Sequence, residues 1–346
     1  MRDFRIITGD CVDVLRSMPD RSVDAIVTDP PYGIGFMGRE WDQSLPGPEL
    51  WAEALRIMKP GAHLVAFAAC RTVHRLAVMI EDVGFTIRDQ IAWMQWQGFP
   101  KSMDIAKALE TEPEMVKRSE WRGWGTALKP AHEPAILARA PLDGTIASTV
   151  RRWGTGALNI EDTRIPYGDP AWPGPNDDHR ASWSSKSQDR NAIMMGDTGR
   201  ARGDLGDYCP TRGRWPANIY YEPKASQSEK QAGCYFLEPK TRAEVTGRKE
   251  GSAGIDNPRA GSRSTAELRN HHPTVKPIKL MAWLWRLVTP PGGLVLDPFT
   301  GSGSTGIAAL RGGFRFVGGE IDPEYAEIAR ARIRFDAPLL NREVTD

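Results

Sequence analysis

The feature that most constrains this chain is a short apolar segment that ends in two consecutive prolines. Residues 22–27 read Ser-Val-Asp-Ala-Ile-Val and predict a buried strand, and Thr28-Asp29-Pro30-Pro31-Tyr32 follows directly. Because proline fixes φ and lacks a backbone N–H, the chain must leave the sheet here in a stiff turn. The turn places a carboxylate and an aromatic ring at the carboxyl end of a strand, where ligands bind in open α/β sheets. A proline-terminated strand with a surface tyrosine is the alternative interpretation.

Strand and helix patterns alternate over the first 140 residues and return after residue 270. We expect seven strands, at residues 4–8, 23–28, 63–69, 85–93, 133–140, 293–297 and 314–320. Helices are predicted at residues 11–18, 48–58, 71–83, 275–287, 304–311 and 323–335. Such alternation predicts a mostly parallel sheet covered by helices on both faces. The strands at 85–93 and 133–140 are candidates for an antiparallel pair.

The stretch at residues 141–270 differs from its flanks in composition. Gly, Ser, Pro, Asp and Arg dominate it, hydrophobic periodicity is weak, and several tryptophans punctuate it. We interpret it as an inserted irregular domain between residues 1–140 and 271–336, with residues 337–346 as a C-terminal tail. A solvated linker of balanced charge is the alternative for the inserted stretch.

Composition narrows the class of protein. No apolar run reaches the length of a membrane span and the N-terminus does not resemble a signal peptide, so we expect a cytoplasmic protein with no membrane partner. The net charge of +1 does not by itself indicate nucleic-acid binding. We expect no metal site, because the combination that could form one fits no common zinc spacing: Cys209, Cys234, His271 and His272.

A second motif joins a predicted strand to a helix at residues 297–306, Asp-Pro-Phe-Thr-Gly-Ser-Gly-Ser-Thr-Gly. Its glycines match G-x-G-x-x-G and allow the backbone to approach a ligand closely at a helix N-terminus. Glu320 closes the next strand, where a carboxylate can accept two hydrogen bonds from a ribose diol. The pattern predicts an adenosine-containing cofactor, with a glycine-rich loop that binds nothing as the alternative.

Together the two motifs resemble those of the S-adenosylmethionine-dependent DNA amino-methyltransferases. Residues 29–32 resemble the catalytic motif of that family and residues 297–303 its cofactor loop, and His-Pro-Thr-Val-Lys-Pro at 272–277 and Gly-Asp-Cys at 9–11 resemble two further motifs. The catalytic motif precedes the cofactor loop, which is the order of the beta class. The resemblance covers nearly all of residues 1–140 and 270–336.

The resemblance implies a doubly wound, mostly parallel, seven-stranded methyltransferase sheet. In such a sheet the strand bearing Asp10 lies beside the strand bearing Glu320, and here these strands lie near opposite ends of the chain. We therefore expect a circularly permuted sheet with its ends close together. The stretch at 141–270 is then the inserted target-recognition domain.

The resemblance also implies catalytic roles for Asp29, Pro30, Pro31 and Tyr32. The exocyclic amine of a base is a poor nucleophile, because its lone pair is delocalised into the ring. Asp29 can accept one amine hydrogen and the Pro30 carbonyl the other, while Tyr32 stacks on the base. The methyl group then moves by direct in-line displacement onto a base flipped out of the duplex. The glycine-rich loop after Tyr32 is a candidate lid, and Trp41 in it is either a stacking residue or a buried anchor.

Cofactor roles follow from the same resemblance. Glu320 is expected to hold the ribose diol, and Asp10 to meet the adenine edge with Cys11 near it. Phe299, Gly301 and Gly303 are expected to line the methionine and ribose side of S-adenosylmethionine. Asp297, Thr274 and Lys276 are expected near the methionyl groups, and Asp29 also borders this site. A surface lysine at a helix start is the alternative for Lys276.

The expected substrate is the N6 amine of adenine in double-stranded DNA. Aspartate in the catalytic motif favours adenine in this family, whereas serine favours N4 of cytosine, which is the alternative. A homodimer and a cognate restriction enzyme are candidate partners. An NAD-dependent dehydrogenase, a non-catalytic DNA-binding relative, and an enzyme acting on RNA or protein are further alternatives.

Overall fold

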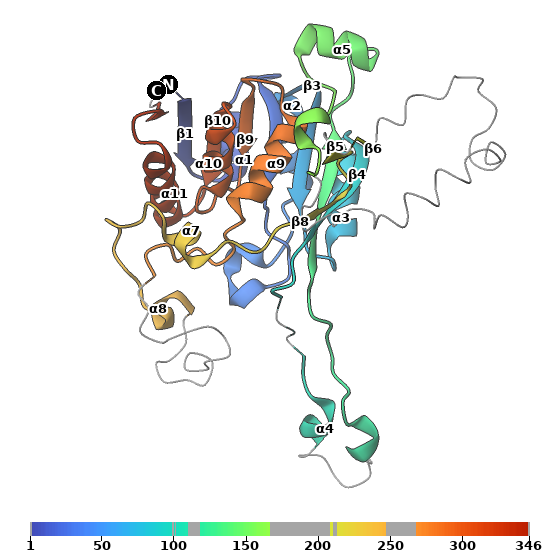
Figure 1. Cartoon of the computed structure of the whole chain (residues 1–346), viewed down its shortest axis with the longest axis vertical. Coiled ribbons are helices and arrows are strands. Elements are labelled where there is room, and N and C mark those ends of the chain that lie inside the picture. Colours follow the sequence, from blue (N-terminus) through green and yellow to red (C-terminus); the bar gives the residue numbers. More distant parts are fainter. Residues whose placement is uncertain are drawn as a thin grey trace, which may run out of the picture.

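A computed structural model describes residues 2–98, 100, 102–109, 118–166, 208–209, 213–246 and 268–344. Its centre is a nine-stranded sheet in the order β11-β1-β10-β9-β2-β3-β5-β4-β8 (Figure 1). The strands are β1 (Arg2–Thr8), β2 (Val23–Thr28), β3 (Met58–Phe67), β4 (Thr86–Met94), β5 (His132–Arg139), β8 (Ile219–Tyr221), β9 (Leu294–Asp297), β10 (Arg315–Glu320) and β11 (Asn341–Glu343). Neighbours pair in parallel except at β5, which is antiparallel to both β3 and β4.

Helices connect the strands and cover the sheet. They are α1 (Cys11–Arg16), α2 (Pro48–Ile57), α3 (Val73–Asp82), α4 (Ile105–Ala108), α5 (Ile146–Trp153), α7 (Gln227–Gln231), α8 (Arg242–Thr246), α9 (Ile278–Val288), α10 (Ser304–Arg311) and α11 (Pro323–Asp336). Short 3-10 turns are η1 (Phe36–Gly38), η2 (Glu40–Asp42), η4 (Arg118–Trp121) and η5 (Glu161–Thr163). A separate ribbon pairs β6 (Tyr208–Cys209) with β7 (Gly213–Arg214).

Side-chain caps fix where the helices nearest the site begin. The Asp10 carboxylate accepts from the backbone N–H of Val12 at 2.8 Å and so starts α1. Asp322 accepts from the N–H groups of Glu324 and Tyr325 and starts α11, whose first residue is a proline. Both caps directly follow a parallel strand, so each strand turns into its helix at the carboxyl edge of the sheet.

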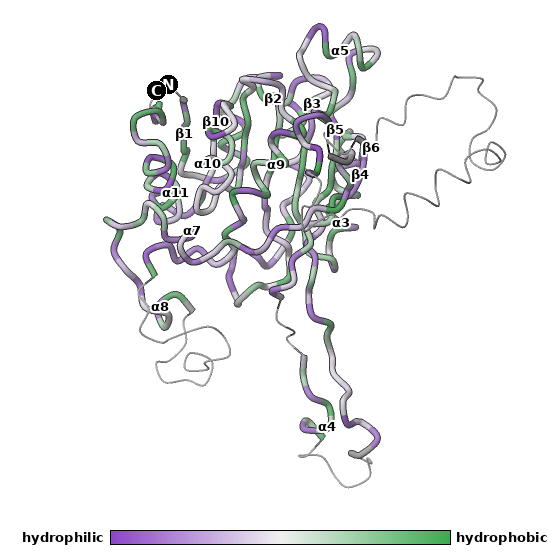
Figure 2. The backbone as a smooth tube through the Cα atoms, in the orientation of Figure 1, coloured by the Kyte–Doolittle hydropathy of each residue, from purple (hydrophilic) through white to green (hydrophobic). Residues whose placement is uncertain are grey.

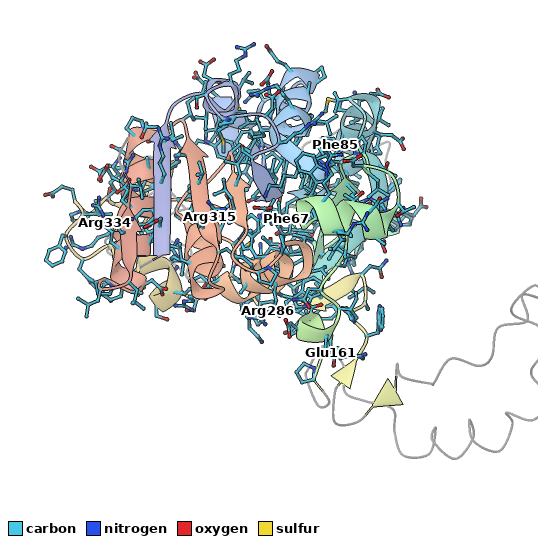
Figure 3. The ribbon with its side chains drawn as sticks, turned by 90° about the horizontal axis from the view of Figure 1, so that it is seen from above. Phe67, Phe85, Glu161, Arg286, Arg315 and Arg334 are labelled. Atoms are coloured by element: carbon cyan, nitrogen blue, oxygen red, sulfur yellow. The ribbon has the colours of Figure 1, made fainter. Side chains whose placement is uncertain are left out.

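Two hydrophobic clusters fill the space on the two faces of the sheet. One contains α9, α10 and α11 residues together with Phe67, and the other contains α1, α2 and α3 residues together with Phe85. Figure 3 shows the blue helices on one side of the sheet and the orange and red helices on the other. Trp51 and Trp285, one in each cluster, are completely buried. Figure 2 shows green, hydrophobic segments in the central strands and in α9. The predicted α/β sheet with helices on both faces is confirmed.

Among the described residues the sheet has nine strands rather than the predicted seven. All seven predicted strands are present, including the antiparallel pair β4 and β5. The two additions, β8 and β11, are three-residue edge strands that pair through the backbone and carry no hydrophobic alternation of their own. β11 pairs with β1, so the two ends of the chain lie side by side (Figure 1).

Described parts of the 141–270 stretch pack against this body. Ile165 is buried in the same cluster as α9, and the carbonyl of Thr163 accepts a hydrogen bond from the Trp283 indole at 3.1 Å. β8 extends the sheet beyond β4. Tyr220 in β8 stacks on Trp283 with ring centroids 4.5 Å apart. The recognition role of this stretch stays a prediction.

β4 and β5 continue past the sheet as an arm that ends in α4 and η4, away from the body (Figure 1). A bridge between Asp104 and Gly125 joins its two sides near the tip. Within the described residues, no helix is long and apolar enough to cross a membrane.

Candidate active site at the carboxyl edge of the sheet

The carboxyl ends of β1, β2, β9 and β10 meet around a cavity of about 280 Å³. Its lining includes most of the residues predicted for the site: Asp10, Cys11, Asp29, Pro31, Thr274, Lys276, Asp297, Phe299, Gly301 and Glu320. Trp41, His272 and Tyr325 also line it. Pro30, Tyr32 and Gly303 are not among its lining residues. The two sequence motifs, 268 positions apart at their aspartates (297 − 29), therefore border one cavity.

Glu320 joins the end of β10 to the glycine loop. One carboxylate oxygen accepts from the backbone N–H of Gly301 at 2.7 Å, and the other accepts from the N–H of Asp322 at 3.0 Å. An ionised carboxylate can accept about four hydrogen bonds, so acceptor capacity remains for two ligand hydroxyls. Burial raises the pKa of the Glu320 carboxyl, and the two backbone donors oppose this shift.

Asp297, at the end of β9, connects the cofactor loop to the catalytic strand. Its Oδ1 accepts from the Thr28 hydroxyl at 2.7 Å and from the Phe299 backbone N–H at 3.1 Å. Thr28 immediately precedes Asp29, so this contact fixes the catalytic turn relative to the loop. Burial raises the pKa of the Asp297 carboxyl to about 6.

Asp10 and Cys11 form the part of the cavity wall at the end of β1. One oxygen of the Asp10 carboxylate caps α1, and Asp10 is also a lining residue of the cavity. Burial, together with the negative charge of Asp10, raises the pKa of the Cys11 thiol to about 11. Cys11 is therefore a neutral, polarisable wall residue at neutral pH and not a thiolate nucleophile.

The glycines of the loop have two different environments. Gly301 has φ +54°, and a Cβ there would meet the His272 ring at 2.8 Å, so the loop backbone lies directly against this imidazole. Gly303 has φ +81°, and a Cβ there would meet Ala329 of α11 at 2.9 Å. Gly301 thus shapes the cavity, whereas Gly303 allows α10 and α11 to approach each other.

His272 is a neutral wall residue. Burial lowers the pKa of its imidazole to about 3, and the nearby charges of Lys276 and Arg332 act in the same direction. The backbone N–H of Thr274 donates to Nδ1 at 3.4 Å, and the ring packs edge-on against Tyr325. The motif at residues 272–277 therefore supplies an aromatic wall, Thr274 and Lys276 to the same cavity. Among the described residues, no three metal-ligating side chains come together.

Asp29 is held by one side chain of its own motif and by one that is distant in the sequence. Its Oδ1 accepts from the Tyr32 hydroxyl at 2.7 Å, and its Oδ2 accepts from the Lys276 ammonium at 2.5 Å. Lys276 Nζ also lies 3.2 Å from the Tyr32 hydroxyl oxygen and 3.4 Å from Glu133 Oε2. Glu133 Oε2 lies 3.3 Å from the Tyr32 hydroxyl. We call these four residues, Asp29, Tyr32, Glu133 and Lys276, the catalytic-turn cluster.

The cluster is an ionic network in an apolar wall. The Lys276 side chain is 7% exposed, which contradicts its interpretation as a surface lysine. Burial lowers the pKa of this ammonium, but the carboxylates of Asp29 and Glu133 outweigh that effect and leave it raised. Burial raises the pKa of the Asp29 carboxyl, and Lys276 opposes the shift. The aromatic rings of Tyr32, Phe67 and Trp93 surround the ammonium at 5.0–5.8 Å.

The loop after Tyr32 folds around one buried carboxylate. Asp42 is 1% exposed and accepts from four backbone N–H groups, those of Tyr32, Gly33, Ile34 and Phe36, at 2.6–3.3 Å. Three glycines with positive φ let the chain curl around it, at positions 33, 35 and 38. Its neighbour Trp41 is 38% exposed and borders the cavity. The candidate lid therefore has a fixed base built on Asp42.

Sequence reasoning missed Glu133 and Asp42. Glu133 stands in Lys129-Pro130-Ala131-His132-Glu133-Pro134, at the start of a buried strand that runs antiparallel to its neighbours. Its carboxylate therefore lies at the same edge as the ends of the parallel strands. A charged residue at the start of an apolar strand was the available signal. Asp42 gave no comparable signal, because acidic residues in glycine-rich loops are ordinarily solvated.

Comparison with known proteins decides the family. A family model described as DNA methylase, covering N6 and N4 enzymes, matches residues 23–331, which is well over half of the chain. This chain belongs to the N6/N4 DNA methylase family. The methylase family uses S-adenosylmethionine as its methyl donor, and the resemblance drawn from the two motifs is confirmed.

Individual relatives are distant but span the methylase along most of its length. The Type II methyltransferase M.HindIII of Haemophilus influenzae is 22% identical over 372 aligned positions, covering 95% of this chain and 94% of that protein. The structure of PvuII DNA methyltransferase, named as cytosine-N4-specific, matches with a TM-score of 0.50 at 16% identity, covering 96% of this chain and 86% of that one. The M1.HpyAVI–SAM complex gives a TM-score of 0.48 at 17% identity, covering 95% and 98%. The PvuII match shows a shared fold.

Proposed function

We propose that this methylase transfers a methyl group from S-adenosylmethionine to the exocyclic N6 of an adenine flipped out of double-stranded DNA. The observation that carries the proposal is the Asp29 carboxylate at the end of β2, which borders the same cavity as Glu320 and the glycine loop. An acceptor for an amine hydrogen thus stands beside the candidate cofactor site. A cytosine N4 amine would present similar chemistry, and aspartate rather than serine at position 29 supports adenine.

Asp29 would accept one hydrogen of the target amine, and the carbonyl of Pro30 the other. Both hydrogen bonds favour a pyramidal nitrogen and free its lone pair for attack along the line of the methyl–sulfur bond. The nitrogen–carbon bond would form as the methyl–sulfur bond breaks, which releases S-adenosylhomocysteine, and the surplus amine proton would pass by way of Asp29 to water. The carbonyl of Pro30 is followed by a proline nitrogen that carries no hydrogen. The rate gain would come mainly from alignment of amine and methyl group in a rigid turn.

The cavity residues fit the proposed cofactor chemically. Carboxylates for hydroxyl and amino groups come from Asp10, Asp297 and Glu320, and apolar surface for the adenine ring comes from Phe299 and Tyr325. When bound, S-adenosylmethionine supplies the methyl group on its sulfonium. Glu320 would hold the ribose diol, Asp10 the adenine edge with Cys11 beside it, and Asp297 with Thr274 the methionyl end.

The remaining roles concern the DNA. Trp41 borders the cavity and is partly exposed, which supports a stacking role on the flipped base. The Tyr32 hydroxyl donates to Asp29, and the Tyr32 ring would turn toward the cavity to stack on the same base. The stretch at 141–270 would read the target sequence, between a catalytic half at 1–140 and a cofactor half at 271–336. A homodimer and a cognate restriction enzyme stay predictions.

The product identifies the target base. Unmethylated plasmid DNA is incubated with purified protein and S-adenosylmethionine, digested to nucleosides, and analysed by mass spectrometry. We expect N6-methyl-2′-deoxyadenosine above the level made by the Asp29→Ala variant. N4-methyl-2′-deoxycytidine as the sole methylated nucleoside would overturn the assignment to adenine, and no methylated nucleoside at all would overturn the proposed activity.

A further inference from the structure

The catalytic-turn cluster contains a lysine and a second carboxylate that the proposed reaction does not use directly. Lys276 lies two residues before α9 and contacts Asp29, whereas Glu133 is the second residue of β5 and contacts Lys276, so both act from outside the catalytic motif. The ammonium lies 2.5 Å from Asp29 Oδ2 and 3.4 Å from Glu133 Oε2, so it stands between the two carboxylates. A buried ion pair contributes little to the free energy of folding, because the cost of removing both charges from water offsets much of their attraction. Stability alone is therefore a weak reason for placing these charges here.

We propose that Lys276 and Glu133 are a pair of positioning residues that set how strongly Asp29 accepts the target amine. Lys276 holds Asp29 as an oriented carboxylate, and Glu133 draws part of the ammonium charge away from it. This inference rests on the proposed role of Asp29 as the amine acceptor.

The charges around Asp29 make the two residues act in opposite directions. Asp29 must be ionised to accept an amine hydrogen, and its burial favours the protonated form. The ammonium of Lys276 favours the ionised form, whereas the carboxylate of Glu133 disfavours it. Too little positive charge would leave Asp29 protonated, and too much would make it a weak acceptor. Lys276 and Glu133 together therefore keep the Asp29 carboxylate ionised and still basic enough to accept a hydrogen bond from the amine.

Glu133 is itself anchored in a way that suits this role. Its Oε2 contacts Lys276 and the Tyr32 hydroxyl, and its Oε1 lies 3.7 Å from Lys224 Nζ near the surface. The Tyr32 hydroxyl lies between the two carboxylates, at 2.7 Å from Asp29 and 3.3 Å from Glu133. Within the described part of the chain, the titratable and charged groups that face the cluster from adjoining elements are Tyr32, Cys70, His132, Glu133, Lys224, His272, Lys276 and Asp297.

The test is the pH dependence of methyl transfer, measured as kcat/KM for DNA at saturating S-adenosylmethionine. In the wild type, kcat/KM should fall at low pH. The pH of this fall, the acid limb of the profile, reports the pKa of the group that must lose a proton before reaction. Lys276→Met should move this limb to higher pH by about 1–3 units, because Asp29 loses its stabilising cation. Glu133→Gln should move it to lower pH by less than about one unit and reduce the plateau rate, because Asp29 becomes a weaker acceptor.

Conservative variants and a matched ion pair serve as controls. Lys276→Arg keeps the positive charge and should leave the limb near its wild-type position. Lys279 and Glu222 form an ion pair at 3.1 Å that lies outside the cavity lining. Lys279→Met and Glu222→Gln should leave both the limb and the plateau unchanged. Thermal melting and S-adenosylhomocysteine binding identify any variant that fails to fold.

The inference is supported if Lys276→Met and Glu133→Gln move the acid limb of the pH profile in opposite directions. The acid limb of Lys276→Arg should stay near that of the wild type. Loss of activity with an unmoved limb, or displacement in the same direction by both variants, would show that the network is merely structural and overturn it. A wild-type protein that transfers no methyl group to DNA would overturn the proposed function and the inference with it. An active wild type with unmoved limbs in the variants would overturn the inference alone.

Discussion

Glu320 and Asp29 both follow a parallel strand at the same cavity, yet they are held by different kinds of partner. Glu320 accepts from two backbone N–H groups, those of Gly301 and Asp322. Asp29 accepts from the side chains of Tyr32 and Lys276, and the ammonium of Lys276 also lies near Glu133. We call these the backbone-held and the side-chain-held sides of the site.

This difference means that the fold sets the position of Glu320, whereas neighbouring side chains set the charge state of Asp29. Backbone donors are placed by the fold itself, so the position of Glu320 follows from β10 and the glycine loop, and no neighbouring substitution changes those donors. The charge state of Asp29 depends on side chains that come from three separate parts of the chain. A cofactor site needs fixed geometry, whereas a group that accepts an amine hydrogen needs a tuned charge.

The largest effect is expected at the side-chain-held side. Asp29→Ala removes the proposed acceptor and should lower the rate of methyl transfer by at least about 100-fold, the loss typical of a hydrogen-bonding group used in the transition state. The affinity for S-adenosylhomocysteine should stay within about threefold, because the carboxylates proposed to hold the cofactor, those of Asp10, Asp297 and Glu320, remain in the cavity wall. Labelled-methyl transfer and calorimetry measure the two quantities. Near-normal turnover in this variant would exclude Asp29 as the acceptor.

A large loss of stability is expected where a carboxylate organises backbone alone. Asp42→Ala leaves four backbone N–H groups without their acceptor and should lower the free energy of unfolding by about 2–3 kcal/mol. Hydrogen exchange at residues 32–36 should accelerate. Glu40→Ala, an exposed acid in the same loop, is the control and should change stability by less than about 0.5 kcal/mol. Equal behaviour of the two variants would contradict the role of Asp42.

Gly303 tests whether the loop is shaped by packing. Gly303→Ala places a Cβ 2.9 Å from Ala329 at a φ of +81° and should cost about 1–3 kcal/mol of stability. Gly38 also has a positive φ, +69°, but a Cβ there meets nothing within 4 Å, so Gly38→Ala should cost about 1 kcal/mol or less. Urea denaturation compares them. A larger cost at Gly38 would show that conformation, and not packing, dominates.

The smallest expected effect is a pH dependence of the affinity for S-adenosylhomocysteine on the backbone-held side. The pKa of Asp297 is raised to about 6, and pairing with a cationic amino group of the ligand would lower it, so binding releases a proton. Affinity for S-adenosylhomocysteine should therefore rise as the pH increases through 6, by up to about tenfold between pH 5 and pH 7. Calorimetry in buffers of different ionisation enthalpy detects the proton. Asp297→Asn should flatten the dependence, and an unchanged slope would place the proton elsewhere.

The sequence predicted the strands and helices that show a hydrophobic pattern within their own residues. Apolar runs identified seven strands, and the parallel arrangement followed from the helices between them. The sequence did not predict β11, and it did not place β8 in the sheet, because a three-residue strand has too few positions for a hydrophobic pattern. Asp29, Asp297 and Glu320 were predicted at one site because their two motifs together resemble those of the methylase family, and each of the three closes a strand.

The partners of those residues could not be read in the same way. Lys276 was predicted near the cofactor, and its ion pair with Asp29 joins positions 247 apart in the chain. Glu133 reaches the site because β5 runs antiparallel, which the strand pattern alone left open. Asp42 is buried only because the loop closes around it. Tertiary contacts of this kind depend on strand order and loop closure, which local periodicity does not contain.

The most direct test of the division between the backbone-held and side-chain-held sides compares Asp29→Asn with Glu320→Gln. Two quantities are measured for each variant: the single-turnover rate at saturating S-adenosylmethionine and the Kd of S-adenosylhomocysteine. We predict a crossover. Asp29→Asn should lose at least about 100-fold in rate with little change in Kd, and Glu320→Gln should raise Kd about tenfold or more with a smaller change in rate. Parallel losses of rate and affinity in both variants would contradict the division between a backbone-held cofactor side and a side-chain-held catalytic side.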